Sequence, residues 1–317
     1  MKLSGSKRKW IGRLLPWLLL CVALLMVFSQ VQNPRSLINV GVPWARVGAL
    51  AIVMTAIILT GGIDLSVASI VSLSSMVMGV LWRNGWSVPS AAIMALVTGI
   101  IAGGFNGTLV VVGLPPLVAT LATMAFYSGL AMMISGAERI TGFPESGLVR
   151  IAGLPTEYWI LAGTFVTALF VIHFTRFGRW CYALGDNPLA ARFAAVPVHR
   201  THWFLYAASG LVAGLLAVIY TMRDGAIPNV HRGIELNAIA CVVVGGTLIT
   251  GGRGGIPLTM LGLVIIANVD IGLSFMSSRV EFFKGEARLV VVGVLLIAVA
   301  VWNEWTARDD AKEVERI

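Results

Sequence analysis

Charged residues are scarce in this chain of 317 residues, in which Asp, Glu, Lys and Arg together account for 12%. A soluble domain carries about 25% charged residues. Hydrophobic residues make up 57% and the mean hydropathy is +0.87. This composition excludes a water-exposed globular protein and indicates a chain that lies in a lipid bilayer, where charged side chains are costly.

Cysteine and histidine are also scarce, with 3 and 4 residues. The cysteines Cys21, Cys181 and Cys241 are too far apart for a disulfide framework, and no Cys or carboxylate completes a metal site around the histidines. The chain has no G-x-x-x-x-G-K-[ST] motif and no defensible arrangement of nucleophile, base and acid. We therefore expect no metal, no cofactor, no ATP site and no enzyme activity in this chain.

The net charge is +8, but the basic residues cluster at the ends of apolar runs without a groove of interleaved aromatic residues. This distribution excludes a nucleic-acid partner and is typical of membrane topology signals. A span needs about 20 apolar residues. Ten runs approach that length, namely 14–31, 47–63, 65–82, 90–113, 116–136, 159–175, 203–220, 237–249, 255–275 and 289–303. The sequence thus predicts an all-α polytopic protein of about ten transmembrane helices in a single domain, 1–317.

Lys and Arg in short loops predict the orientation. The basic N-terminus 1–13, the loop 176–202 and the tail 304–317 are expected in the cytoplasm, and the loops 137–158 and 221–236 outside. One external loop, 276–288, carries three basic residues against this rule. An alternative for the first run is a signal peptide cleaved near Ser29, and its removal would leave nine spans with the same topology.

Two glycine pairs interrupt the apolar runs, Gly61-Gly62 before Asp64 and Gly245-Gly246. Their similar surroundings are consistent with an inverted repeat containing broken or short helices. Asp64 precedes a long apolar run, so its favoured role is to cap that helix with its carboxylate. Ion coupling and contact with a translocation path are the other two roles that an intramembrane carboxylate can have.

Several motifs occur in a characteristic order, beginning with Gly61-Gly62-Ile63-Asp64-Leu65-Ser66. The others are Asn106-Gly107, Pro115-Pro116-Leu-Val-Ala-Thr120-Leu121-Ala-Thr123-Met124, Tyr182-Ala-Leu-Gly185-Asp186-Asn187-Pro-Leu-Ala190-Ala191-Arg192, Glu235-Leu-Asn237-Ala-Ile-Ala, Val244-Gly245-Gly246-Thr247 and Gly251-Gly252-Arg253-Gly254. Together they span roughly 47–302 and resemble the permease subunits of ribose-type monosaccharide ABC importers.

The resemblance implies a permease in the bacterial inner membrane, with both termini cytoplasmic. It implies an ABC ATPase, in two copies or as a tandem, a second permease that is a copy or a paralogue, and a periplasmic sugar-binding protein. The other hypothesis is a self-sufficient secondary transporter that uses Asp64 or Asp270 as its coupling carboxylate.

The resemblance also assigns ATPase coupling to the cytoplasmic loop, through Gly185, Asp186, Asn187, Ala190, Ala191 and Arg192. Pro188 is well placed to start a short helix there, and Ala191 is expected to lie against a groove of the partner. The alternative is a solvated basic loop that only fixes topology.

Polar residues within the runs are candidates for lining a path, or else they satisfy neighbouring helices. They are the seven residues Asn106, Thr120, Thr123, Tyr127, Asn237, Asn268 and Asp270, and in addition the serines Ser72, Ser74 and Ser75. Three positions depart from the resembled family, which commonly has Asp at 237, Arg at 128, and Asn or Gly at 270. The sequence does not name the sugar.

Overall fold

The computed structural model describes residues 34–144, 149–229 and 233–277, with 290, 293, 294 and 297 as isolated positions. Helices dominate, which confirms the prediction of a helical membrane protein, although one two-stranded hairpin is also present. Its strands are β1 (Arg150–Ile151) and β2 (Leu154–Pro155), which pair antiparallel. The basic N-terminus 1–13, the run 14–31, most of the run 289–303 and the tail 304–317 lie outside the described residues.

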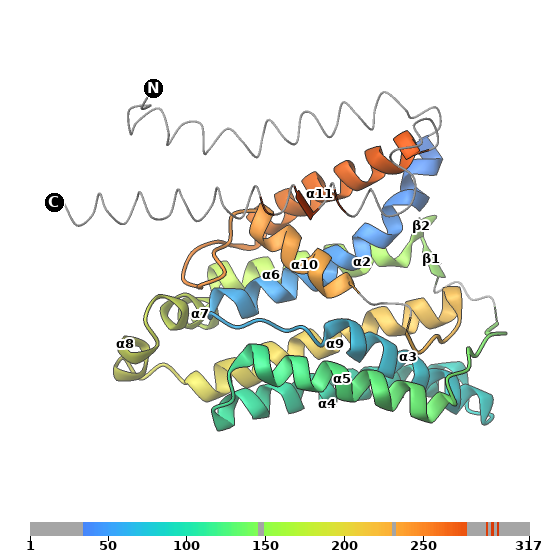
Figure 1. Cartoon of the computed structure of the whole chain (residues 1–317), viewed down its shortest axis with the longest axis horizontal. Coiled ribbons are helices and arrows are strands. Elements are labelled where there is room, and N and C mark those ends of the chain that lie inside the picture. The colour runs from blue at the N-terminus through green and yellow to red at the C-terminus, as the bar shows by residue number, and fades with distance from the viewer. Residues whose placement is uncertain are drawn as a thin grey trace.

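In the part of the chain that the structure describes, six helices are long and apolar enough to cross a membrane. They are α2 (Pro34–Leu59), α4 (Val88–Val112), α5 (Pro116–Ser135), α6 (Thr156–Phe174), α9 (Val198–Asp224) and α11 (Ile256–Ser277). Two shorter apolar helices are α3 (Val67–Arg83) and α10 (Ile234–Val244). The remaining two are α7 (Arg176–Asp186) and the six-residue α8 (Pro188–Phe193). The long helices lie side by side, with α7 and α8 at one end of the bundle and the hairpin at the other (Figure 1).

The helix breaks follow from glycine. The run 237–249 is predicted as one span, but α10 ends at Val244 because Gly246 has a φ of 99° that a helix does not allow. The chain also leaves the helical conformation between Leu59 and Val67, around Gly61 and Asp64. The predicted breaks are thus present, whereas the inverted repeat stays a prediction.

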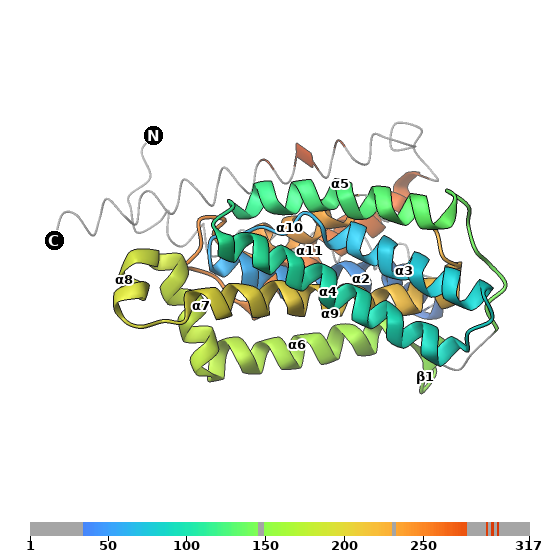
Figure 2. The same ribbon diagram turned by 90° about the horizontal axis from the view of Figure 1, so that it is seen from below.

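Helix α2 forms the centre of the core. Its apolar window is 89% buried, whereas that of α6 is 11% buried, so α6 is a peripheral helix. α2 contacts α6, α9, α10 and α11. Figure 2 shows α5 and α6 at opposite sides of the bundle, with α4 and α9 between them.

Helices α4 and α9 approach closely through glycine. A methyl group on Gly103 of α4 would lie 2.9 Å from the Cα atom of Gly210 in α9, and one on Gly99 would lie 3.0 Å from the Cα atom of Gly214. Within each helix the two glycines are four residues apart. This is the small-xxx-small pattern, which lets membrane helices touch along their backbones. This packing fixes the position of Ser209, which faces the break before α3.

Candidate functional site

The break between α2 and α3 is organised by Asp64, whose side chain is fully buried. Its Oδ1 atom accepts hydrogen bonds from the amide of Ser66 at 2.9 Å and the hydroxyl of Ser66 at 2.7 Å. Its Oδ2 atom accepts one from the hydroxyl of Ser209 at 3.1 Å. The N-cap position of α3 belongs to Ser66, so the carboxylate holds the turn that precedes the helix. A buried carboxylate needs such donors because desolvation is costly.

Three predicted path residues extend this arrangement, which we call the Asp64 network. Asn106 of α4 donates from Nδ2 to the hydroxyl of Ser66 at 2.6 Å. The hydroxyl of Tyr127 in α5 lies 3.1 Å from Oδ1 of Asn106, and that of Thr120 lies 3.1 Å from the carbonyl oxygen of Ile63. These side chains are buried within the protein. Their hydrogen bonds hold α3, α4, α5 and α9 together, which favours a structural role over the lining of a path.

Of the other predicted path residues, Thr123 adjoins this network through Thr120, whereas Asn237, Asn268 and Asp270 lie apart from it. Thr123 donates to the carbonyl oxygen of Thr120 at 3.2 Å, and Asn268 donates to that of Val264 at 2.7 Å. Asp270 of α11 accepts a hydrogen bond of 3.1 Å from Nε1 of Trp44 in α2, and Asn237 is half-buried on α10. The structure therefore does not bring the seven residues to one surface.

A buried ion-pair cluster at the hairpin end of the bundle escaped the sequence analysis. Oε1 of Glu157 lies 2.7 Å from Nη2 of Arg46 and 2.7 Å from Nη1 of Arg223, and Arg46 also lies 3.4 Å from Asp224. The guanidinium of Arg46 stacks 3.8 Å from the ring centre of Tyr220. Opposite charges are matched within the cluster, which ties α2, α6 and α9; removing one partner would leave a buried charge unpaired.

The opposite end carries the α7–α8 elbow. Oδ1 of Asn187 accepts hydrogen bonds of 3.0 Å from the amides of Leu189 and Ala190, and Pro188 occupies the first turn, so α8 starts where the sequence predicts. Figure 1 shows α8 projecting beyond the long helices. Its apolar side chains are uncovered, with Leu189 67% and Phe193 91% exposed.

One expectation for the elbow is wrong. The sequence predicts that Ala191 faces a partner, but its side chain is 3% exposed and packs inside the chain. A six-residue helix has one inner face, and the small side chain of Ala191 occupies it. Asp186, Asn187, Ala190 and Arg192 are exposed. On α7, burial raises the pKa of the Cys181 thiol to about 12. The thiol is therefore uncharged and contributes to packing.

The elbow is joined to the bundle through a glycine junction, formed by Gly61, Gly185, Gly251 and Gly252. A methyl group on Gly185 would strike the carbonyl oxygen of Leu59 and the amide nitrogen of Gly252, both of them backbone atoms. One on Gly251 would lie 2.8 Å from the amide nitrogen of Gly61. Gly251 also has a φ of 90°, which favours glycine.

The predicted signature glycines therefore separate in space. Gly61 and Gly185 meet at the junction, whereas Gly62 lies beside Tyr206, whose hydroxyl would be 3.0 Å from an added methyl group. Gly245 packs against the start of α11, and Gly246 is open.

A cavity of about 570 Å³ lies between α3, α5 and the start of α10. Its walls are Ala68, Ser69 and Ser72 of α3, Met124, Ala125, Ser128, Gly129 and Met132 of α5, and Asn229 and Glu235 near α10. We call it the serine cavity. One of its lining residues, Ser72, is a path candidate predicted from the sequence, whereas none of the seven residues discussed above lines it. The signal in the sequence is the spacing of Ser69 and Ser72, which places two hydroxyls on one helical face.

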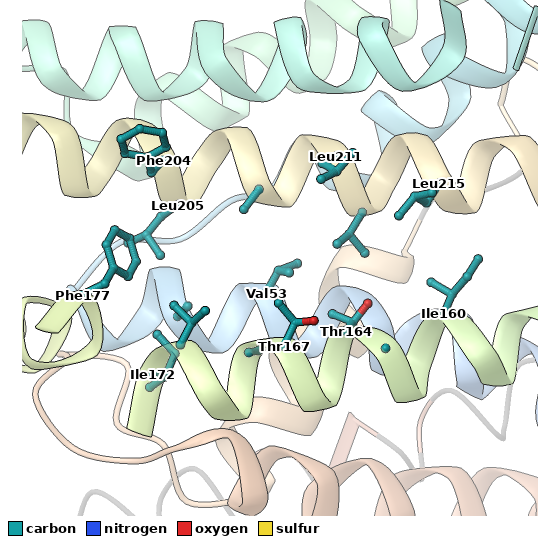
Figure 3. Close-up of a pocket in the computed structure, with 16 residues that line it drawn as sticks. Val53, Ile160, Thr164, Thr167, Ile172, Phe177, Phe204, Leu205, Leu211 and Leu215 are labelled. Atoms are coloured by element: carbon teal, nitrogen blue, oxygen red, sulfur yellow. The ribbon is translucent and has the colours of Figure 1, made fainter. Parts of the chain in front are cut away.

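A second hollow, of about 580 Å³, separates α6 from α9 above α2. Figure 3 shows Leu211 and Leu215 of α9 and Ile160 of α6 among its lining residues, with oxygen only on Thr164 and Thr167. Such an apolar surface in membrane-spanning helices suits an acyl chain rather than a hydrated solute. Within the described residues, no three His, Cys, Asp or Glu side chains are placed to hold a metal ion.

Comparison with known proteins places the chain in a family. The ribose import permease protein RbsC of Escherichia coli (strain K12) is 34% identical over 265 residues, covering 80% of this chain and 81% of the relative. RbsC of Bacillus subtilis (strain 168) is 35% identical over 298 residues, covering 91% of each chain. The autoinducer 2 import system permease protein LsrD of Klebsiella pneumoniae is 32% identical over 320 residues, covering 94% of each.

No solved structure matches the chain. The sequence profile of the family described as "Branched-chain amino acid transport system / permease component" matches residues 37–300, which is most of the chain and every helix described above from α3 to α11. The chain belongs to this family of membrane permease components.

Proposed function

We propose that this chain is the membrane-spanning subunit of an ATP-driven importer of a simple sugar. The observation that carries the proposal is its similarity to ribose import permeases over 80% or more of the chain. The exposed apolar tip of α8, with Leu189 and Phe193, supports docking of a separate ATPase, because uncovered large apolar side chains mark protein interfaces. The sequence contains no P-loop, so ATP hydrolysis belongs to that partner.

The proposed assembly follows the resembled importers. It has two permease chains, two ATPase subunits or a tandem, and a periplasmic protein that delivers the sugar. We place about ten spans in the bacterial inner membrane, with both termini and the α7–α8 elbow in the cytoplasm. The four arginines of the loop 176–202 support that orientation. Reporter fusions at Asp186 and at Ile151 test it, since they should signal cytoplasm and exterior respectively; an external signal at Asp186 would overturn the topology.

A secondary transporter is the rival function, and the contacts of its two candidate carboxylates weigh against it. Both oxygens of Asp64 accept hydrogen bonds, and Asp270 is engaged by Trp44. The test is uptake of D-ribose by vesicles that hold the permease, its ATPase and ATP, with binding protein outside. We expect uptake that needs ATP and survives collapse of the pH gradient. Uptake without ATP that an ionophore abolishes would establish the rival.

A further inference from the structure

We infer that the serine cavity holds the substrate during its passage, and that it selects a neutral polyhydroxy compound over an amino acid. This inference rests on the proposed function, which it deepens by naming the residues and the substrate class. The new element is the assignment of these residues: the ribose in the names of the relatives is itself a neutral polyhydroxy compound, whereas the family description refers to branched-chain amino acids.

The hydroxyl groups of the cavity come from two helices that face one another. Ser69 and Ser72 of α3 are each 4% exposed, and Ser128 of α5 is half-buried. The hydroxyl of Ser69 donates to the carbonyl oxygen of Ser66 at 2.7 Å, which leaves its lone pairs as acceptors toward the cavity. The hydroxyl of Ser69 can therefore only accept from a sugar, whereas a hydroxyl whose proton is not engaged can both donate and accept.

The size and the apolar walls also suit a monosaccharide. A volume of about 570 Å³ lies within the range of about 300–1,000 Å³ that small-molecule sites occupy. Met124 and Met132 contribute flexible apolar surface for the carbon face of a sugar ring. Gly129 has no side chain to fill the cavity, and no other atom lies within 4 Å of the position where an added methyl group would be.

The charges decide between the substrate classes. Among the lining residues the one ionisable side chain is Glu235, whose two oxygens lie 3.1 Å from the amide of Gly233. Among the lining residues that the structure describes there is no Lys, Arg or His. The carboxylate of an amino acid normally binds charged or N–H donors, and among these described residues it would meet the like charge of Glu235 and no cationic side chain. A neutral polyol meets no such penalty.

The position of the cavity links it to the Asp64 network. Ser66 accepts at its carbonyl from Ser69 on the cavity side and donates from its amide and hydroxyl to Asp64 on the other. A shift of the Asp64 network would thus move Ser69 directly. This gives the cavity a route by which events at the elbow can change its shape.

The first experiment compares two serines of the same helix. Ser72→Ala removes a cavity hydroxyl, whereas Ser74→Ala removes a hydroxyl that is buried without a partner among the described residues and does not line the cavity. In vesicles with ATPase and binding protein, we expect Ser72→Ala to lower D-ribose uptake by about three- to tenfold, the loss of one hydrogen bond. Ser74→Ala at equal insertion should not lower it; equal uptake by both would overturn the inference.

The second experiment needs no ATP and so separates this inference from the proposed function. Ser72→Cys and Ser74→Cys are labelled with a small methanethiosulfonate in the assembled complex, and each site is quantified by peptide mass spectrometry. D-ribose should slow labelling at 72 and not at 74, and L-leucine should slow neither. Protection at 72 by L-leucine alone, or by neither compound, would overturn the assignment. If D-ribose protects but is not transported with ATP, the proposed function fails and the site stands.

Discussion

The amide of Gly252 donates a hydrogen bond of 3.0 Å to the carbonyl oxygen of Leu59, the last residue of α2. Gly185 packs on the same two atoms, so the elbow, the loop after α10 and the end of α2 meet at one point. Asp64 follows only five residues later in the chain. Movement of α8 can therefore reach the Asp64 network through backbone contacts, which are stiffer than contacts between flexible side chains.

Gly185→Ala should disturb this junction. The added methyl group meets backbone atoms that no rotamer change can move, so α7 must shift away from α2, at a cost of about 1–3 kcal/mol. We expect the ATPase to bind but sugar uptake to fall relative to ATP hydrolysis. Gly163→Ala in α6 is the matched control, because its methyl group would enter open space. Equal ratios of uptake to hydrolysis in both variants would contradict the role of the junction.

If the Gly185→Ala protein fails to insert into the membrane, a milder pair of variants tests the same junction. The hydroxyl of Tyr182 in α7 donates to the carbonyl oxygen of Gly254 at 3.0 Å, and that of Tyr158 donates to the carbonyl oxygen of Ile38 at 2.8 Å at the other end. Tyr182→Phe should reduce the ratio of uptake to ATP hydrolysis, whereas Tyr158→Phe, with the same chemical loss, should leave it unchanged.

Phe193→Glu should weaken docking of the ATPase. The side chain is 91% exposed at the end of α8, so the fold tolerates the change, while a desolvated charge at an interface centre costs about 2 kcal/mol or more. Co-purification should fall at least about tenfold. Trp86→Glu, an exposed aromatic in the turn between α3 and α4, serves as the control. Unchanged association of the Phe193 variant would show that the elbow only fixes topology.

Asp64→Asn should retain much of the transport, and Asp64→Leu should lose folding. An amide oxygen can still accept from Ser66, and its NH₂ group can donate to the oxygen of Ser209. Leucine leaves the buried amide of Ser66 without its acceptor, at a cost of about 1–3 kcal/mol. Membrane levels and thermal unfolding of the three proteins measure the difference. Normal insertion of the Asn variant without any transport would make the charge itself functional.

The sequence was a good guide to features that depend on neighbours along the chain. Apolar runs marked α2 to α6, α9 and α11, and the Asn187-Pro188 pair marked the start of α8, because both signals are local. The cluster around Glu157 was missed because Arg46 lies 111 residues away, and apolar patterning carries no signal for such a pair. The glycine junction is made of backbone contacts without periodicity, and the orientation of Ala191 depends on how α8 packs.

Tyr206→Phe should not lower stability. Its hydroxyl is buried beside Gly62 and has no hydrogen-bond partner within the described parts of the chain, so the native structure carries the desolvation cost of an unmade bond. Removing the hydroxyl should raise the unfolding temperature or leave it unchanged. Tyr127→Phe should lower it, because that hydroxyl lies 2.9 Å from the carbonyl oxygen of Ala102 and 3.1 Å from Asn106. If Tyr206→Phe keeps its stability but loses uptake, the hydroxyl gains its partner in another state of the transport cycle, and the Asp64 turn beside it is the place to look.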